Sequence, residues 1–103
     1  LHDMFTILEF LQMEGCGFAE QGEAWKQVEE GRTVRDGELP INTSGGLKSK
    51  GHPLGASGVA QGYEIYKQLV DEAGPRQVEA DTGLACNVGG FGNCVITTIM
   101  EAR

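Results

Sequence analysis

One segment of the chain, SGGLKSKGHPLGASG at residues 44–58, is dense in glycine around a single His-Pro pair. A loop that only connects two elements rarely needs so many glycines, which allow a second backbone or a ligand to approach closely. Pro53 fixes the backbone directly after His52. A histidine titrates near neutral pH and can act as an acid, a base or a hydrogen-bond donor. The segment therefore predicts either a site built around His52 or a tight turn in which this histidine is bonded locally.

Composition limits the classes of protein to be considered. With 103 residues, 40% of them hydrophobic, the chain is long enough for one small soluble domain. A net charge of −7 disfavours nucleic acid or an anionic membrane surface as the main partner. No apolar run approaches the ~20 residues of a membrane helix. Lys48 and Lys50 form a local basic spot beside His52, which either faces solvent or meets the phosphates of a ligand.

The three cysteines indicate a cellular compartment rather than a metal site. Their number is odd, and they form neither a C-x-x-C pair nor a metal-like spacing with the two histidines. A reducing environment explains this pattern most simply, so we expect a cytoplasmic protein without a metal ion. We expect Cys16 and Cys94 to be small buried hydrophobic residues.

Apolar spacing predicts three helices in the first three quarters of the chain. The first begins after a cap at Asp3 and ends at Gly15, the second is short and spans residues 19–30, and the longest spans residues 57–73. Residues 43–55 are expected to form a glycine-rich loop. That loop precedes the longest helix, whose N-terminal N–H groups are then directed toward His52.

The end of the chain predicts two strands joined by a second glycine loop. Residues 80–87 and 94–100 are the strand candidates, and residues 87–93 form the loop. The second strand does not alternate apolar and polar residues, which predicts burial on both faces. Cys86, at the end of the first strand, is either a reactive thiol next to backbone donors or a small buried hydrophobic residue.

Three motifs resemble those of the thiolase superfamily. NTSGGLKSKGHPLGASG (42–58) is similar to the signature N-x-x-G-G-x-x-x-x-G-H-P-x-G-x-S/T-G over its full length, and CNVGGFGNCVITTIMEAR (86–103) resembles the final loop and strand. HDMFT (2–6) is similar to the HDCF motif of sterol-carrier-protein-type and archaeal thiolases, which are acetyl-CoA acetyltransferase-like. The motifs occur in the order of the family and cover the chain from end to end.

The resemblance implies an α/β fold in which two similar halves each contain a mixed sheet with flanking helices. Residues 1–103 resemble only the later part of the C-terminal αβα half. The N-terminal half, with its nucleophilic cysteine, is then absent, and the chain begins at Leu1 without an initiator methionine. We therefore expect a partial C-terminal domain, either a piece of a longer thiolase or one component of a split one. The family implies a homo-oligomer for the whole protein.

The resemblance also implies a reaction and roles for three side chains. Thiolases catalyse Claisen condensation or thiolysis of acyl-CoA, so the substrate is a coenzyme A thioester and no cofactor is covalently bound. By resemblance, His52 activates the absent nucleophile and donates a hydrogen bond to the thioester oxygen. Cys86 is the acid/base thiol that exchanges the α-proton. His2 holds a water or the thioester oxygen.

Four further residues are assigned to the walls of the site by the same resemblance. The backbone N–H groups of Val88 and Gly89 supply a second oxyanion hole. Gly90 and Gly51 belong to the glycine loops that admit the thioester.

Departures from the family leave a second function open. Met4 stands where HDCF proteins have a cysteine, and a thioether cannot transfer protons, so acid/base chemistry falls to Cys86. The alternative is a non-catalytic subunit that binds acyl-CoA or scaffolds a thiolase complex. The related ketoacyl synthases fit less well, because Leu47 occupies their usual lysine position and Pro53 follows the histidine.

Overall fold

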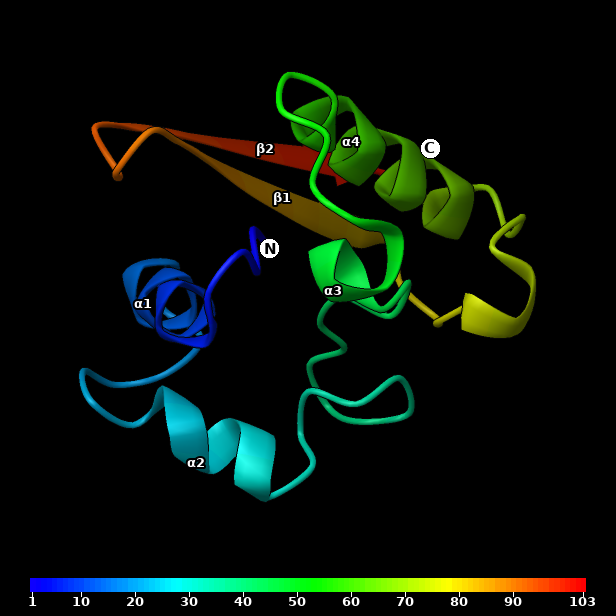
Figure 1. Ribbon diagram of the computed structural model, residues 1–103. Coiled ribbons are helices and arrows are strands. Elements are labelled where there is room, and N and C mark those ends of the chain that lie inside the picture. Colours follow the sequence, from blue (N-terminus) through cyan, green and yellow to red (C-terminus); the bar gives the residue numbers. More distant parts are fainter.

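The computed structural model describes all of residues 1–103 (Figure 1). It contains helices and a two-stranded antiparallel sheet, in agreement with the expected mixed α/β class. None of the helices combines the length and the hydrophobicity needed to cross a membrane. The elements follow in the order α1 (Thr6–Gly15), α2 (Ala24–Glu29), α3 (Gly46–Lys50), α4 (Ser57–Leu69), the 3-10 turn η1 (Gly74–Arg76), β1 (Thr82–Gly89) and β2 (Cys94–Glu101).

Helix α4 lies along the β1–β2 hairpin, and two glycines allow the close approach of helix and strand (Figure 1). A Cβ atom at Gly83 of β1 would come within 2.6 Å of the Ile65 side chain on α4. At Gly58, in the first turn of α4, a Cβ atom would come within 3.0 Å of Asn87 Nδ2. The start of α4, which follows the His-Pro turn, is therefore held against the C-terminal half of β1.

The N-terminal segment is organised differently from the prediction. Helix α1 ends at Gly15 as expected, but it begins at Thr6 with Phe5 as its N-cap, and no side chain caps it. Asp3 does not cap α1. Its carboxylate instead accepts a hydrogen bond from the Leu47 N–H in α3, at 2.9 Å. Asp3 thus connects the start of the chain to the glycine-rich segment.

The glycine-rich segment is not a continuous loop, because α3 occupies part of residues 43–55. Gly45 and Gly46 have φ values of 86° and 61°, which turn the chain into this short helix. The other helices are shorter than predicted: α2 spans 24–29 rather than 19–30, and α4 ends at Leu69 rather than at residue 73. After α4, the chain continues to the 3-10 turn η1, which contains Gly74 and Pro75.

Both predicted strands are present, but the loop between them is shorter than expected and the second strand is not buried. β1 extends to Gly89, which pairs with Cys94 and leaves residues 90–93 as the turn. In β2, Val95, Ile96 and Ile99 are 55–63% exposed. The prediction of burial on both faces is wrong for this chain, because α4 packs mainly against β1 and little of the chain covers the faces of β2. Cys94 is also exposed, contrary to expectation.

Candidate active site

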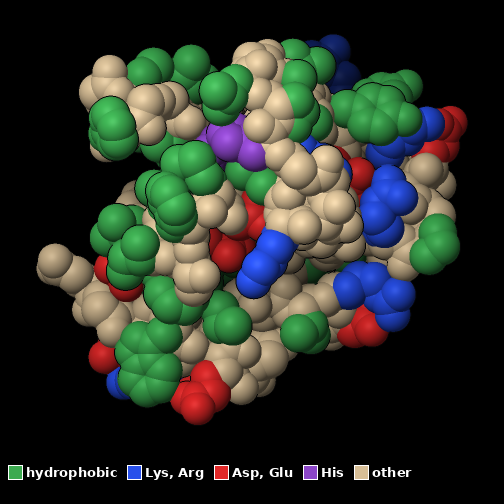
Figure 2. Space-filling model, viewed as in Figure 1, with side chains coloured by type: hydrophobic (Ala, Val, Ile, Leu, Met, Phe, Trp, Pro, Cys, Tyr) green, Lys and Arg blue, Asp and Glu red, His purple; other side chains and the backbone are tan.

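Two histidines from distant parts of the chain lie in contact. The ring centroids of His2 and His52 are 4.9 Å apart, and the rings meet edge to face at 85°. In Figure 2, histidine atoms appear as one small patch, bordered mainly by hydrophobic and uncharged groups. The fold thus brings together two of the three side chains that the sequence assigned to chemistry.

Ser57 and the turn at Pro53 position His52. Ser57 Oγ, in the first turn of α4, lies 2.7 Å from His52 Nδ1. The Pro53 carbonyl accepts hydrogen bonds from the backbone N–H groups of Ala56 and Ser57, which leads the chain directly into α4. The position of His52 is therefore determined by the N-terminus of α4 through a buried serine, while its ring stays partly exposed.

Gln12 of α1 positions the main chain of His2. The His2 N–H donates to Gln12 Oε1 at 2.8 Å, and Gln12 Nε2 donates to the His2 carbonyl at 2.7 Å. The neighbouring Asp3 bonds to α3, so both sides of this segment are fixed. The side chain of His2 is 1% exposed.

Asn87 of β1 contacts the His2 ring. Asn87 Oδ1 lies 2.9 Å from His2 Nδ1, and His2 Nε2 is buried without a hydrogen-bond partner. Burial lowers the pKa of His2, and the nearby His52 lowers it further, whereas the Asn87 hydrogen bond and the Asp3 carboxylate act in the opposite direction. The net effect favours a neutral imidazole at physiological pH.

Cys86 is buried in β1 but does not contact either histidine ring through a hydrogen bond. Its thiol accepts a long contact of 3.7 Å from Thr97 Oγ1 on β2. Successive side chains of a strand point to opposite faces, so Cys86 lies on the face opposite Asn87. Burial, followed by the proximity of Cys86, raises the pKa of the Cys16 thiol. The two cysteines therefore form a separate cluster behind the strand.

Of the four loop residues predicted to line the site, two belong to a strand and two lie in turns with positive φ. Val88 and Gly89 are not loop residues: they belong to β1 and pair with Val95 and Cys94. Gly90 lies in the turn with φ 60°, and Gly51 follows α3 with φ 85°. Only Gly51 is adjacent in sequence to one of the paired histidines.

A hollow of about 380 Å³ opens beside His52. Lys48 and Met4 line it, together with Asp3, Phe5, Thr6, Glu9 and Leu47. Met4, at the position of the HDCF cysteine, therefore borders this hollow. No three His, Cys, Asp or Glu side chains are grouped to hold a metal ion.

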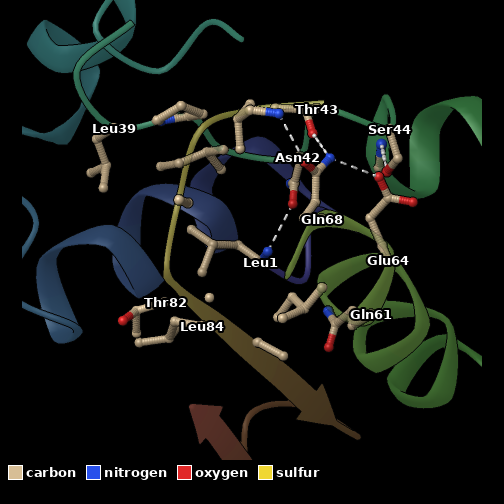
Figure 3. Close-up of a pocket in the computed structure, with 18 of the residues that line it drawn as sticks. Leu1, Leu39, Asn42, Thr43, Ser44, Gln61, Glu64, Gln68, Thr82 and Leu84 are labelled. Atoms are coloured by element: carbon tan, nitrogen blue, oxygen red, sulfur yellow. Dashed lines mark hydrogen bonds between the residues drawn. The ribbon is translucent and has the colours of Figure 1, made fainter. Parts of the chain in front are cut away.

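A larger cavity of about 480 Å³ lies elsewhere, between α4, β1 and the segment before α3 (Figure 3). Its lining includes the backbone-bonding Gln68 and the apolar Leu1 and Leu84, but neither histidine. It is thus separate from the histidine pair. Gln68 donates to Thr43 Oγ1 and to the Arg76 carbonyl and fixes the wall of this cavity.

Three polar residues that build the site were missed from the sequence: Gln12, Ser57 and Asn87. Gln12 carried a usable signal, since it lies on the same helix face as Leu8, where an apolar residue is expected. Ser57 is part of the glycine-rich signature, and its position five residues after His52 allows a local contact. Nothing in the sequence connects Asn87 to His2, because the two are 85 positions apart.

His2, His52 and Asn87 come from the three segments whose sequences resemble thiolase motifs. The model of the family described as "Thiolase C-terminal domain-like" matches residues 1–102. The chain therefore belongs to this family of thiolase C-terminal domains.

Individual proteins similar to this chain include acetyl-CoA acetyltransferases and sterol carrier protein 2. The chain is 52% identical to an acetyl-CoA acetyltransferase of Methanothermobacter thermautotrophicus, with 98% of this chain and 27% of the relative covered. It is 46% identical to sterol carrier protein 2 of Bos taurus, with 98% of this chain and 19% of the relative covered. An acetyl-CoA acetyltransferase of Methanocaldococcus jannaschii is 43% identical over 109 residues. The chain thus spans between 19% and 28% of the length of these relatives.

Proposed function

We propose that this chain is the C-terminal part of a thiolase-type acyltransferase that carries out Claisen condensation or thiolysis of acyl-CoA. The substrate is a coenzyme A thioester, and no covalently bound cofactor takes part. The observation that carries the proposal is the contact between His2 and His52, each with its Nδ1 bonded to a separate polar side chain. Membership of the thiolase family and the acetyl-CoA acetyltransferase relatives support it.

In this proposal His52 serves the nucleophilic cysteine of the missing part. It removes the thiol proton, and in its protonated form donates a hydrogen bond to the thioester oxygen. Its bond to Ser57 and its partial exposure at the hollow lined by Lys48 support this role, because the ring is oriented and still accessible. Lys48 and Lys50 are candidates to meet the phosphates of coenzyme A.

The proposed roles of His2 and Cys86 differ in how directly the geometry supports them. The buried His2, beside His52, holds a water or the thioester oxygen. Cys86 is proposed as the acid/base thiol that takes and returns the α-proton, and it lies next to Asn87, which bonds to His2. The Cys86 thiol lies on the face of β1 opposite Asn87. This role therefore requires the substrate or the thiol to be placed differently relative to β1 when substrate is bound. Val88, Gly89 and Gly90 are the proposed backbone donors of a second oxyanion hole.

The chain is proposed to act with the rest of a thiolase in the cytoplasm and as part of a homo-oligomer. The apolar side chains exposed on β2 support a covering partner, since a strand of this composition is usually buried. The acidic net charge disfavours nucleic acid and membranes as partners.

A second candidate function is that of a non-catalytic subunit that binds acyl-CoA or scaffolds a thiolase complex. Two observations favour it: Met4, which lines the hollow beside His52, has no titratable group, and the Cys86 thiol is separated from the histidine pair by the strand.

Two substitutions in the complete protein that contains this chain test the proposal. We expect His52→Ala to abolish formation of the acyl-enzyme, measured by mass spectrometry after addition of acetyl-CoA. We expect Cys86→Ala to leave acylation intact but to stop deuterium exchange at the α-carbon. Cys94→Ala, at an exposed cysteine, is the matched control. Full turnover in either variant removes the role assigned to that residue, whereas binding of acyl-CoA by the wild-type protein without turnover favours the second function.

A further inference from the structure

We infer that Asn87 is a positioning residue that fixes His2 in the tautomer protonated at Nδ1, so that the buried Nε2 is a hydrogen-bond acceptor. The inference concerns the site of the proposed function and refines it. It decides which kind of hydrogen-bonding group His2 can hold.

The first step is the direction of the bond between His2 and Asn87. Asn87 Oδ1 is a carbonyl oxygen, which only accepts hydrogen bonds. At 2.9 Å from His2 Nδ1, it requires a proton on that nitrogen. A neutral imidazole carries one N–H proton, so Nε2 is then an acceptor. The burial of His2, which disfavours the charged form, keeps the ring neutral.

The second step is the state of Nε2. It is buried and has no hydrogen-bond partner within the chain, although His2 itself is 1% exposed. Buried polar atoms in folded proteins are almost always paired, with protein or with ordered water. An acceptor in this position pairs with an O–H, N–H or S–H donor. It cannot pair with the carbonyl oxygen of a thioester, which is itself an acceptor.

The third step is that the Asn87 carboxamide is held in place. Asn87 Nδ2 lies against the Cα of Gly58 so closely that a Cβ atom there would come within 3.0 Å of it. The β1 backbone and the first turn of α4 thus confine Asn87 from two sides. This packing limits movement of the carboxamide, and the bond to His2 Nδ1 defines which of its two ends faces the ring.

The contrast with His52 gives the inference its functional meaning. The partner of His52 is a hydroxyl, which both donates and accepts, and Ser57 Oγ also lies 3.3 Å from the Pro53 carbonyl. When Ser57 donates to Pro53, His52 Nδ1 carries the proton; when Ser57 donates to His52, Nε2 carries it. The hydroxyl partner of His52 is therefore compatible with either tautomer, whereas the amide oxygen bonded to His2 is compatible with only one. As an acceptor, Nε2 of His2 can bond to a water or another donor but not directly to the thioester oxygen.

The test is a measurement of ring tautomers in the complete protein, labelled with ¹⁵N-histidine, at about pH 9, where an imidazole is neutral. Long-range ¹H–¹⁵N spectra distinguish a protonated from a bare ring nitrogen, and His2→Gln assigns the signals of His2. We expect the wild type to be protonated at Nδ1 of His2. We expect Asn87→Leu to shift His2 to the Nε2-protonated form, and Asn87→Asp, whose carboxylate accepts in the same place, to restore Nδ1 protonation.

The controls separate this inference from the proposed function. Ser57→Ala should alter the His52 signals and leave those of His2 unchanged. An Nε2-protonated His2 in the wild type, or an Nδ1-protonated His2 in Asn87→Leu, overturns the inference even when acyl transfer is intact. Should Asn87→Leu not fold, the wild type and the near-isosteric Asn87→Asp still decide it: an Nε2-protonated ring in either overturns it. Absence of acyl transfer with the expected tautomers contradicts the proposed function alone.

Discussion

Gln12 holds the main chain of His2 at both of its polar groups, donating to its carbonyl at 2.7 Å and accepting from its N–H at 2.8 Å. The same amide also donates to the Leu8 carbonyl one turn earlier in α1, at 3.0 Å. Through Gln12, helix α1 therefore fixes the position of the His2 main chain. The Gln12 amide thus satisfies the N–H and carbonyl of His2, as a neighbouring strand would in a β-sheet.

Replacement of Gln12 by leucine should destabilise the protein and disturb His2. The substitution leaves the buried N–H and carbonyl of His2 without partners, at a cost of about 1–3 kcal/mol for each buried group. Urea denaturation measures the change. Gln21→Leu, at an exposed glutamine without a side-chain hydrogen bond, is the matched control and should change the free energy of unfolding by less than about 0.5 kcal/mol. Equal effects in the two variants would contradict the assigned role of Gln12.

Gly46→Ala should cost more than Gly55→Ala. Both glycines have positive φ, which costs an L-residue about 1–2 kcal/mol. Gly55 faces open space, whereas a Cβ atom at Gly46 collides with the carboxylate of Asp3. Asp3 then loses its bond to the Leu47 N–H, a charge-assisted hydrogen bond worth about 1.5–3 kcal/mol. Thermal unfolding of the two variants compares them directly, and a smaller loss in Gly46→Ala would show that Asp3 moves without cost.

The buried His2 should make stability depend on pH below neutrality. Its pKa is lowered in the folded state, chiefly by burial, from an unfolded value of about 6.5. As the pH falls below that value, the unfolded chain binds a proton that the folded chain does not, so the free energy of unfolding decreases until the folded pKa is reached. The part of this decrease that comes from His2 should be absent in His2→Gln.

Glu9 affects the pH dependence of stability in the opposite direction to His2. The wild type must therefore be compared with His2→Gln to isolate the contribution of His2. Burial raises the pKa of Glu9, so its protonation favours the folded state as the pH falls. The difference between wild type and His2→Gln, measured by urea denaturation from about pH 7 to pH 5, isolates the histidine. A constant difference across that range would rule out a lowered pKa for His2.

The isolated chain should associate at increasing concentration. Phe91, Val95, Ile96 and Ile99 are all largely exposed, and β2 has an unpaired edge. Val95 and Ile99 share one face of the strand, so the double variant Val95→Lys/Ile99→Lys should shift the chain toward the monomer. Sedimentation velocity over a range of concentrations measures this. A well-folded wild-type monomer at every concentration would contradict the expectation.

The sequence predicts the long elements well and the short ones poorly. The hairpin, α1 and α4 follow from periodicity and from β-branched residues, which act over many positions at once. Helix α3 was missed, because its five residues lie within a glycine-rich segment and depend on a bond from Asp3. Burial of β2 was mispredicted for a different reason: its apolar composition predicts a buried strand, whereas little of this chain packs against β2.

In the candidate site, too, the sequence predicts local features better than contacts between distant residues. His52 is conspicuous in the sequence because Pro53 and the surrounding glycines shape its turn. The contact of His52 with His2, and the bonds of His2 to Gln12 and Asn87, are formed across long separations that no local pattern encodes. The motifs indicate which residues matter, and only the fold shows how they are held.

The bond between His2 and Asn87 has a consequence for biosynthesis. It joins residues 85 positions apart, so during translation the N-terminal histidine emerges long before the residue that orients its ring. Contacts of such large sequence separation form late and slowly in folding. A polypeptide that stops before β1 therefore carries both histidines but not the completed site, and premature termination yields a product without the oriented histidine pair.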